Sequence, residues 1–406
     1  MVMLFRLFLI GVAIIATGSQ RVKAQADDSL LIRILQGKDA TLDQVLSNSA
    51  KYNFQLILSV FSDNKGKDEL VHYSINRDKY FFSPASLIKF PVAVVALEKL
   101  TALQARYGIT IEDSLELITC SCDLSSRSYV RNTRPATFRQ LLREMLILSD
   151  NDAYNVMFDF LGKDYFNTRI RQLGYQRINL RRRFYFPCDY GAQERFGGFR
   201  FYDPLGKLQY EIPCQTSQGE WRNDSNWPHT AGQKHLENGK WVAGPKSFLD
   251  GNYVSLWEAH RLLIDVLSAD TLPDSPFFAI EDSMRQELID ALGSYPRALQ
   301  SGRYQGEKYP DHYYKYFLDP KTMVTADNQL KIYNKVGISG GFISDVSYFY
   351  DQQSGLRFFL SGAMLAKKDG LMDNGKYDYY DIGIPVFRKI GSLVYAYLMQ
   401  NLPESY

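Results

Sequence analysis

Ser86 and Lys89 are the first residues in this sequence whose types and spacing suggest chemistry. They stand three residues apart in the segment SPASLIKFPVA, where the chain enters a long apolar run. On a helix, residues three apart share a face with Cβ atoms ~5–6 Å apart, so the lysine amine can reach the serine hydroxyl. A hydroxyl becomes a useful nucleophile beside a base, and a lysine acts as that base when burial or a nearby cation lowers its pKa. The pair therefore indicates an activated serine.

A second segment, Ser149-Asp150-Asn151, carries three polar side chains in a suggestive place. It follows the amphipathic stretch 138–148 and opens another helical stretch, DAYNVMFDFLG. Serine, aspartate and asparagine all cap helices, so the tripeptide is also a plausible N-cap cluster. The structural and the catalytic interpretations are compatible.

A third segment, YNKVGISGGFISDVSYF, places Lys335 on a strand that runs into Gly337 and a glycine-rich turn. A cation at Lys335 would lower the pKa of Lys89 and attract an anionic substrate. The backbone N–H of Ile338, with that of Ser86, would form an oxyanion hole. The competing interpretation is a plain hairpin.

Two other motifs lack the setting that their chemistry needs. The stretch Ser62-Asp63-Asn64-Lys65 is also Ser-x-x-Lys, but it lies in a polar link with no apolar support. The run from Gly337 to Gly341 matches Gly-x-Ser-x-Gly, which requires a following helix and a later histidine. A strand-like stretch follows instead, and no histidine comes after His312. We discount both motifs.

Together the three segments resemble the serine β-lactamase and penicillin-binding-protein superfamily, whose shared motifs are Ser-x-x-Lys, Ser-Asp-Asn and Lys-Thr-Gly. Their order and separation are most similar to class A β-lactamases, and the resemblance extends over most of 54–174 and 255–398. It implies a β-lactamase-like or transpeptidase-like fold and a role for each matching residue. By this resemblance, Ser86 would be the acylated nucleophile, Lys89 its proton acceptor and Ser149 the proton relay to the leaving nitrogen. Asn151 would bind the substrate's amide side chain, and Lys335 would stabilise charge. The substrate-binding strand would comprise Val336, Gly337, Ile338 and Ser339, with Ile338 at the oxyanion hole.

The sequence departs from the family pattern at two places. Val336 stands where the family has a hydroxyl that helps to bind a carboxylate, so that recognition is weakened or reassigned, for example to Ser339. Class A enzymes also carry a glutamate that activates the deacylating water. Its expected place falls near Phe184, in a run without a carboxylate, which leaves Glu194 or Asp189 as substitutes. Without such a base, acylation can proceed while hydrolysis lags.

The order of expected elements predicts an α+β fold. Both chain ends, 27–82 and 325–406, supply an antiparallel sheet, and a helical lobe at 83–324 is inserted between them within one catalytic domain, 27–406. Thr137 is the expected N-cap of one helix. Apolar periodicity predicts helices at 41–50, 84–100, 138–148, 152–161, 164–173, 255–267, 280–292 and 385–399, and strands at 54–61, 70–75, 330–336, 342–350 and 357–366.

Residues 184–246 are too long and irregular for an ordinary connection, and we interpret them as an insertion or lid. Cys188 and Cys214 lie within this segment and could close a disulfide in an oxidising compartment. Cys120-Ser121-Cys122 is too tight to favour an internal bridge, so other pairings remain open.

The N-terminus predicts export. Arg6 precedes an apolar run at 7–16, and Ala24-Gln25-Ala26 fits a cleavage site, so residues 1–26 have the pattern of a signal peptide without a lipid-anchoring cysteine. No later stretch looks long enough to span a bilayer, which favours a secreted or periplasmic protein. The net charge of +2 gives no reason to expect nucleic acid, and the five histidines show no metal-ligand spacing. We expect a monomer without metal or cofactor.

The expected function is that of an exported serine hydrolase of the class A β-lactamase type. It would acylate Ser86 with a β-lactam or related amide and hydrolyse the acyl-enzyme, an activity associated with antibiotic resistance and β-lactam catabolism. One alternative is a D-alanyl-D-alanine peptidase or wall-peptide amidase acting on a peptidoglycan peptide. Another is a penicillin-binding protein that acylates with little turnover, because the deacylating glutamate is not found.

Overall fold

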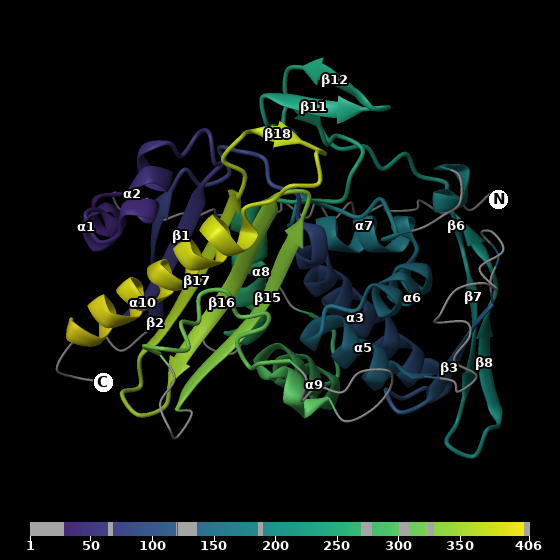
Figure 1. The fold of residues 1–406 in the computed structure, drawn as a ribbon. Coiled ribbons are helices and arrows are strands. Elements are labelled where there is room, and N and C mark those ends of the chain that lie inside the picture. Colours follow the sequence, from purple (N-terminus) through teal and green to yellow (C-terminus); the bar gives the residue numbers. More distant parts are fainter. Residues whose placement is uncertain are drawn as a thin grey trace, which may run out of the picture.

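A five-stranded antiparallel sheet forms one lobe, and both ends of the chain contribute to it (Figure 1). The computed structural model describes residues 28–63, 68–118, 120, 136–185, 190–268, 278–299, 309–323 and 329–401. The strands, in the order in which they lie side by side, are β15 (Leu330–Ser339), β16 (Phe342–Asp351), β17 (Arg357–Leu365), β1 (Gln55–Asp63) and β2 (Asp68–Ile75). The predicted sheet built from both chain ends is thus confirmed.

The hairpin of β15 and β16 is the longest pairing in the sheet and presents Lys335 to the second lobe. Its register runs from Leu330 opposite Asp351 to Ser339 opposite Phe342. The two turn residues, Gly340 and Gly341, have φ values of 60° and 90°. A two-residue turn with both central φ values positive matches the right-handed twist of the flanking strands, and glycine adopts it without strain.

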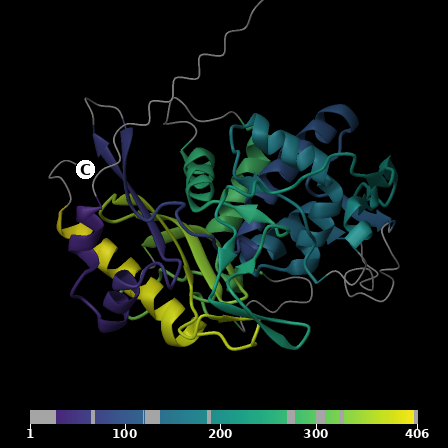
Figure 2. The ribbon, with the colours of Figure 1, turned by 90° about the horizontal axis from the view of Figure 1, so that it is seen from above.

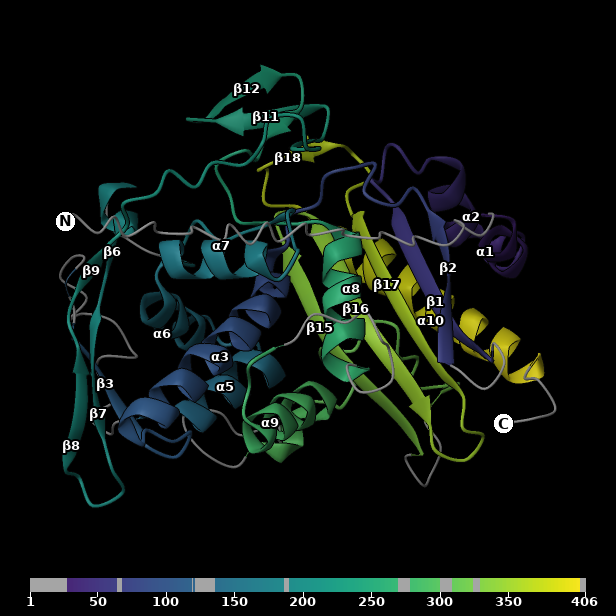
Figure 3. The same ribbon diagram turned by 180° about the vertical axis from the view of Figure 1, so that it is seen from behind.

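Helices cover both faces of this sheet. One face carries α10 (Ile384–Gln400), α1 (Ser29–Leu35) and α2 (Ala40–Ser47), and the opposite face carries α8 (Leu256–Leu267) (Figures 1 and 3). Phe317, Phe358 and Phe387 belong to the hydrophobic cluster under α10. Because both sheet faces are covered, the inner strands β1 and β17 have nearly continuous apolar sequences.

The segment Tyr379–Gln400, which includes α10 and the preceding π-helical turn η5 (Tyr379–Gly383), is long and apolar enough to cross a membrane by length and composition. The expectation that no later stretch has this length is therefore wrong. Val386, Phe387 and Ile390 of α10 are buried against the sheet, which accounts for the apolar composition as that of a core helix.

The second lobe is helical and is built around α3 (Lys89–Tyr107) (Figure 2). Val92 to Leu97 of this helix are all fully buried, so the run that predicted a core helix lies in the core. Around α3 pack α5 (Phe138–Ile147), α6 (Asn151–Leu161), α7 (Lys163–Gln172) and α9 (Asp282–Gly293). Oγ1 of Thr137 accepts a hydrogen bond from the Gln140 N–H at 3.1 Å, which confirms the predicted N-cap.

The segment 184–246 divides between two edges of the molecule. Its first strands, β7 (Gly198–Tyr202) and β8 (Leu208–Ile212), extend a four-stranded sheet with β3 (Ser114–Ile118) and β4 (Ala136–Thr137) on the outer side of the helical lobe (Figure 1). Farther along, β11 (Lys234–Glu237) pairs with β12 (Lys240–Ala243) and with β18 (Leu371–Met372). The remaining short elements are β5 (Ile178–Asn179), η2 (Tyr190–Glu194), β6 (Arg195–Phe196), β9 (Gln215–Thr216), β10 (Thr230–Ala231), β13 (Lys246–Ser247), β14 (Tyr253–Val254) and η3 (Pro296–Ala298). A role as a lid stays a prediction.

Cys214 forms a disulfide with Cys120, with Cα atoms 6.1 Å apart. The predicted Cys188–Cys214 pairing is therefore wrong. Cys120 follows β3 and Cys214 follows β8, two strands that both border β7, so the bond joins the ends of one small sheet. Cys122 and Cys188 lie outside the described residues, as does the predicted signal peptide, 1–26.

Candidate active site

Ser86 lies on the 3₁₀ turn η1 (Ala85–Ile88), which leads directly into α3. The turn packs against β15 so closely that a Cβ on Gly337 would lie 2.2 Å from the carbonyl oxygen of Pro84. Only glycine permits this approach. The turn thus holds the half-buried Ser86 beside the strand that carries Lys335 and Ile338.

Lys89 is fully buried, and its amine contacts Ser86 and the segment 149–151. Its Nζ lies 3.0 Å from Oγ of Ser86, 3.3 Å from Oγ of Ser149 and 2.7 Å from Oδ1 of Asn151. It also donates to the carbonyl oxygen of Ser149 at 2.5 Å. Burial, and then the positive charge of Lys335, hold the pKa of Lys89 well below its usual range. A neutral amine within hydrogen-bond distance of a hydroxyl can serve as a base.

Ser149, Asp150 and Asn151 form the connection between α5 and α6. Oδ1 of Asp150 caps α6 by accepting from the Ala153 N–H at 2.7 Å. Ser149 has a left-handed backbone with φ of 58°, which is uncommon for a residue with a side chain. The cap and the bend together direct Ser149 and Asn151 toward Lys89, so the helix-capping and the catalytic interpretations describe the same arrangement.

Lys335 reaches the site from β15 and is 2% exposed. Its Nζ donates to Oγ of Ser149 at 2.9 Å and lies 5.7 Å from the centre of the Tyr314 ring. Burial lowers the pKa of Lys335 to about 7, although the nearby Asp345 carboxylate opposes this. Ser149 therefore sits between two lysines and can pass a proton from one side of the site to the other.

Behind Lys335 lies a buried polar network that sequence reasoning missed. Lys315 donates to Oδ1 of Asn334 at 2.9 Å, and Asn334 donates to Oδ1 of Asp345 at 2.9 Å. Asp345 also accepts from the backbone N–H of Tyr316 at 2.8 Å. Burial lowers the pKa of Lys315 to about 8 and raises that of Asp345 to about 6. The network ties residues 309–323 to β15 and β16; its signal in the sequence was the polar residues within otherwise apolar strands.

The remaining predicted substrate-binding residues differ in their surroundings. Val336 is 1% exposed and belongs to the hydrophobic cluster under α10, so its side chain does not reach the site. Ser339 is exposed at the end of β15, and Ile338, half-buried, lies between it and Gly337. The strand thus offers the site mainly its backbone, apart from Lys335.

The place expected for the deacylating glutamate holds an aromatic ring. The centre of the Phe184 ring lies 5.3 Å from Nζ of Lys89 and 4.4 Å from the ring of Tyr154. The side chain of Asn155 accepts from the Phe184 N–H at 2.8 Å and donates to its carbonyl oxygen at 2.9 Å. These contacts hold a non-ionisable group beside Lys89.

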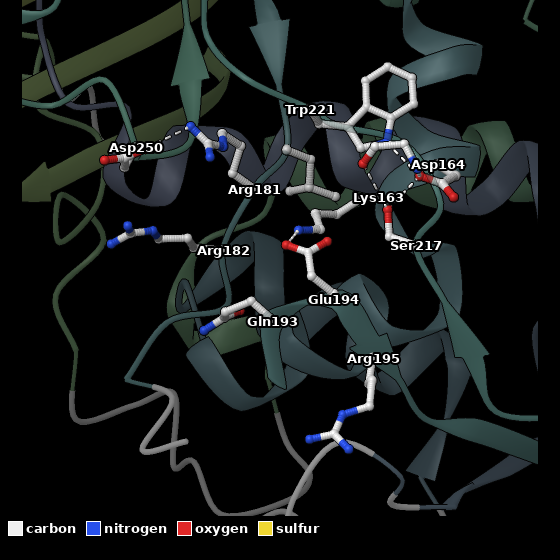
Figure 4. A network of polar contacts seen from close by, with 12 residues as sticks. Lys163, Asp164, Arg181, Arg182, Gln193, Glu194, Arg195, Ser217, Trp221 and Asp250 are labelled. Carbon is white, nitrogen blue, oxygen red and sulfur yellow. Dashed lines mark hydrogen bonds and ion pairs between the residues drawn. The ribbon is translucent and has the colours of Figure 1, made fainter. Parts of the chain in front are cut away.

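Glu194 is engaged elsewhere. It forms an ion pair with Lys163 at the start of α7 (Figure 4). The neighbouring Asp164 accepts from Oγ of Ser217 at 2.6 Å and from Nε1 of Trp221 at 2.5 Å, which anchors the insertion to the same helix (Figure 4). The Glu194 carboxylate is therefore paired with Lys163 and does not replace the deacylating glutamate beside Lys89. Asp189 lies outside the described residues.

A cleft of about 510 Å³ opens beside Ser149. Its lining comprises the segment 148–152 and four tyrosines, and we call it the tyrosine cleft. The tyrosines are Tyr185, Tyr309, Tyr313 and Tyr314. Sequence reasoning missed this feature, although the run YPDHYYKYF showed the density of aromatic residues. Within the described ranges, no group of three His, Cys, Asp or Glu side chains is placed to hold a metal ion.

Comparisons with known proteins identify the fold. Residues 40–203 match the model of the Beta-lactamase enzyme family. The structure of PBP-A aligns with a TM-score of 0.52 at 14% identity, covering 93% of this chain and 99% of that chain. An acyl-enzyme complex of a PBP-A variant with penicillin G aligns with a TM-score of 0.51 at 14% identity, covering 93% and 100%. A class A β-lactamase from Mycobacterium abscessus aligns with a TM-score of 0.49 at 12% identity, covering 88% and 99%.

No curated protein is similar enough in sequence to match the chain. The alignments to PBP-A show the fold, and the predicted α+β β-lactamase-like or transpeptidase-like class is confirmed. The chain therefore has the fold of the serine β-lactamases and penicillin-binding proteins, and its residues 40–203 are similar to the Beta-lactamase enzyme family.

Proposed function

We propose that this protein is a penicillin-binding serine enzyme that acylates Ser86 readily and releases the acyl group slowly. The observation that carries the proposal is the contrast at Lys89. Its Nζ is 3.0 Å from the hydroxyl to be activated, while a phenyl ring, and not a carboxylate, stands beside it. The contacts of Lys89 therefore support acylation of Ser86 better than hydrolysis of the acyl-enzyme.

Acylation follows from the contacts of Lys89. The neutral amine takes the proton of Ser86 as its Oγ attacks the substrate carbonyl, and backbone N–H groups of Ser86 and Ile338 stabilise the oxyanion. The ammonium then returns the proton through Oγ of Ser149, 3.3 Å away, to the leaving nitrogen as its bond to the carbonyl carbon breaks. Lys335, which donates to the same oxygen, orients Ser149 and offsets negative charge.

Deacylation needs a water molecule deprotonated near the ester carbonyl. A positioned general base contributes roughly 10²–10⁴-fold to such a step. Phe184 can neither accept a proton nor hold a water by hydrogen bonding, and its backbone is clamped by Asn155. The acyl-enzyme should therefore be long-lived.

Intact-protein mass spectrometry over time tests the proposal. Penicillin G should add its full mass to the protein, and the adduct should persist long after free antibiotic is removed. Ser86→Ala should show no adduct. Hydrolysis of a chromogenic cephalosporin, measured in parallel, reports turnover. Rapid loss of the adduct with many turnovers would establish a true β-lactamase, whereas no serine adduct with any β-lactam would overturn the proposal.

A wall-peptide amidase is the second candidate, and Val336 is the observation that favours it over a D-alanyl-D-alanine peptidase. Its buried side chain replaces the hydroxyl that would help to bind a terminal carboxylate, so an amide lacking that carboxylate suits the strand better. Release of D-alanine from a pentapeptide would instead support the peptidase. In either case we place the enzyme outside the cytoplasm, since the Cys120–Cys214 disulfide suits an oxidising compartment. We also propose that it is a monomer.

A further inference from the structure

The tyrosine cleft adjoins the catalytic machinery but has no part in the chemistry derived above. It begins at Ser149, whose Oγ contacts both lysines, and continues past Asn151 and Asp152 to the four tyrosines. At about 510 Å³ it falls within the range of small-molecule sites. A substrate bonded to Ser86 would extend one of its substituents into this space.

Three of the four tyrosines form a continuous aromatic wall. The ring centres of Tyr309 and Tyr313 are 4.8 Å apart, and those of Tyr313 and Tyr314 are 4.3 Å apart. Tyr185 lines the same cleft and is 80% exposed. The face of Tyr314 already lies 5.7 Å from the amine of Lys335. Ring faces arranged in this way attract cations.

The wall is held in place before any substrate binds. Lys315 follows Tyr314 directly in the chain, and its buried amine donates to the Ile332 carbonyl oxygen at 2.7 Å and to Asn334 at 2.9 Å. The Asn334 side chain donates back to the carbonyl oxygen of Tyr314 at 2.9 Å. A pre-organised wall loses little conformational freedom when a ligand docks.

The charged residues in the lining of the cleft are acidic, although the amine of Lys335 lies near it, 5.7 Å from the Tyr314 ring. The lining contains Asp150 and Asp152 and no lysine or arginine. Both carboxylates are near enough to Lys89 for their charges to act on that amine, which places them at the reactive end of the cleft. Asp150 caps α6, and Asp152 occupies the first turn of the same helix.

We propose that the tyrosine cleft selects acyl donors that carry a protonated amine. The ammonium group would lie against the ring face of Tyr313, away from the Tyr314 ring that Lys335 faces, and be attracted by Asp152, while the acyl carbonyl reaches Ser86. The inference rests on the proposed acylation of Ser86 and adds the substrate class to it. An anionic substituent in the same position would meet two carboxylates and no cation from the lining.

Penicillin G and ampicillin, which differ by a single amino group on the acyl side chain, form a matched pair of probes. The second-order rate of Ser86 acylation should be higher for ampicillin at a pH where its amine is protonated, and added salt should narrow the difference. Asp152→Asn and Tyr313→Leu should each lower the ampicillin-to-penicillin G rate ratio by about fivefold, the scale of a partly desolvated charge or cation–π contact.

Asp282→Asn is the matched control, because it also removes one carboxylate from the first turn of a helix, α9, outside the cleft. This variant should keep the wild-type ratio, and circular dichroism should report intact folding in every variant. Equal rates for the two antibiotics, or a ratio that Asp152→Asn leaves unchanged, would overturn the amine preference while Ser86 acylation stands. Absence of acylation by both would instead count against the proposed function itself.

Discussion

The ring of Phe184 lies 5.3 Å from the amine of Lys89, held there by paired hydrogen bonds to the side chain of Asn155. A charged side chain at this position would change both halves of the catalytic cycle. Phe184→Glu should shorten the lifetime of the penicillin G adduct by about 10²-fold, the lower end of the ~10²–10⁴ that a positioned base contributes. The adduct decay measured by intact mass checks this.

Phe184→Gln is the control for that substitution, because it has the same shape as glutamate without the base. Its adduct should stay long-lived. The new carboxylate of Phe184→Glu should also raise the pKa of Lys89, since an opposite charge favours the ammonium form, and so move the acylation profile to higher pH. Equal lifetimes for the two variants would show that Phe184 does not limit deacylation.

The pH dependence of acylation should follow the two lysines. The rate requires Lys89 neutral and benefits from Lys335 charged, so it should rise as Lys89 loses its proton and fall above about pH 7, the pKa of Lys335. In Lys335→Met the alkaline fall should disappear. The rising limb should move to higher pH because the charge that lowers the pKa of Lys89 is gone.

Acylation rates at a series of pH values measure both limbs. Lys99→Met is a suitable control, because burial lowers the pKa of Lys99 to about 8 although it contacts Phe160 rather than the site. Its profile should match wild type. A Lys335→Met profile with an unchanged alkaline limb would assign that limb to another group.

A buried relay of hydroxyls and imidazoles should make the fold sensitive to acid. Ser59 lies 2.6 Å from Nδ1 of His72 and 2.7 Å from Nε2 of His260, whose Nδ1 is 2.7 Å from Ser361. Burial lowers the pKa of His72 to about 4. Between that value and about 6.5 the unfolded state binds more protons, so stability is complete above this window and is lost as pH falls through it.

Urea unfolding at pH 7 and pH 5 should show a loss of about 2 kcal/mol from His72, with His260 adding to it in the same direction. His72→Gln should flatten the pH dependence, since it can still bond to Ser59 without titrating. His235→Gln, on the β11–β12 hairpin, should leave it unchanged. A His72→Gln protein with the full pH slope would contradict the assignment.

The disulfide between Cys120 and Cys214 should be a main support of the small sheet at the edge of the helical lobe. Cross-linking residues 94 apart removes much chain entropy from the unfolded state, and losing such a bond costs roughly 2–5 kcal/mol. Cys120→Ser should therefore lower the free energy of unfolding in urea by that amount. Peptide mapping without reduction should recover the two cysteines in one linked pair; a Cys188–Cys214 peptide would refute the observed pairing.

Much of the fold could be predicted from helix caps and apolar periodicity in the sequence. Thr137 was identified as an N-cap because its hydroxyl precedes an amphipathic run, and the helix begins where predicted. Pro91 falls at the third residue of α3, where its missing N–H has no intrahelical partner to lose. By contrast, α1 (Ser29–Leu35) was missed, since seven residues are too few for a clear period.

The chain by itself determined which residues lie on the same helix, strand or cap, because hydrogen bonding and apolar periodicity act over a few residues. Ser86 and Lys89 belong to that level. Only the tertiary structure decided that Cys120, and not Cys188, meets Cys214, and that Phe184 comes to rest beside Lys89. These pairings join residues about ninety apart, where many partners are open to the chain and the packing of whole elements selects one.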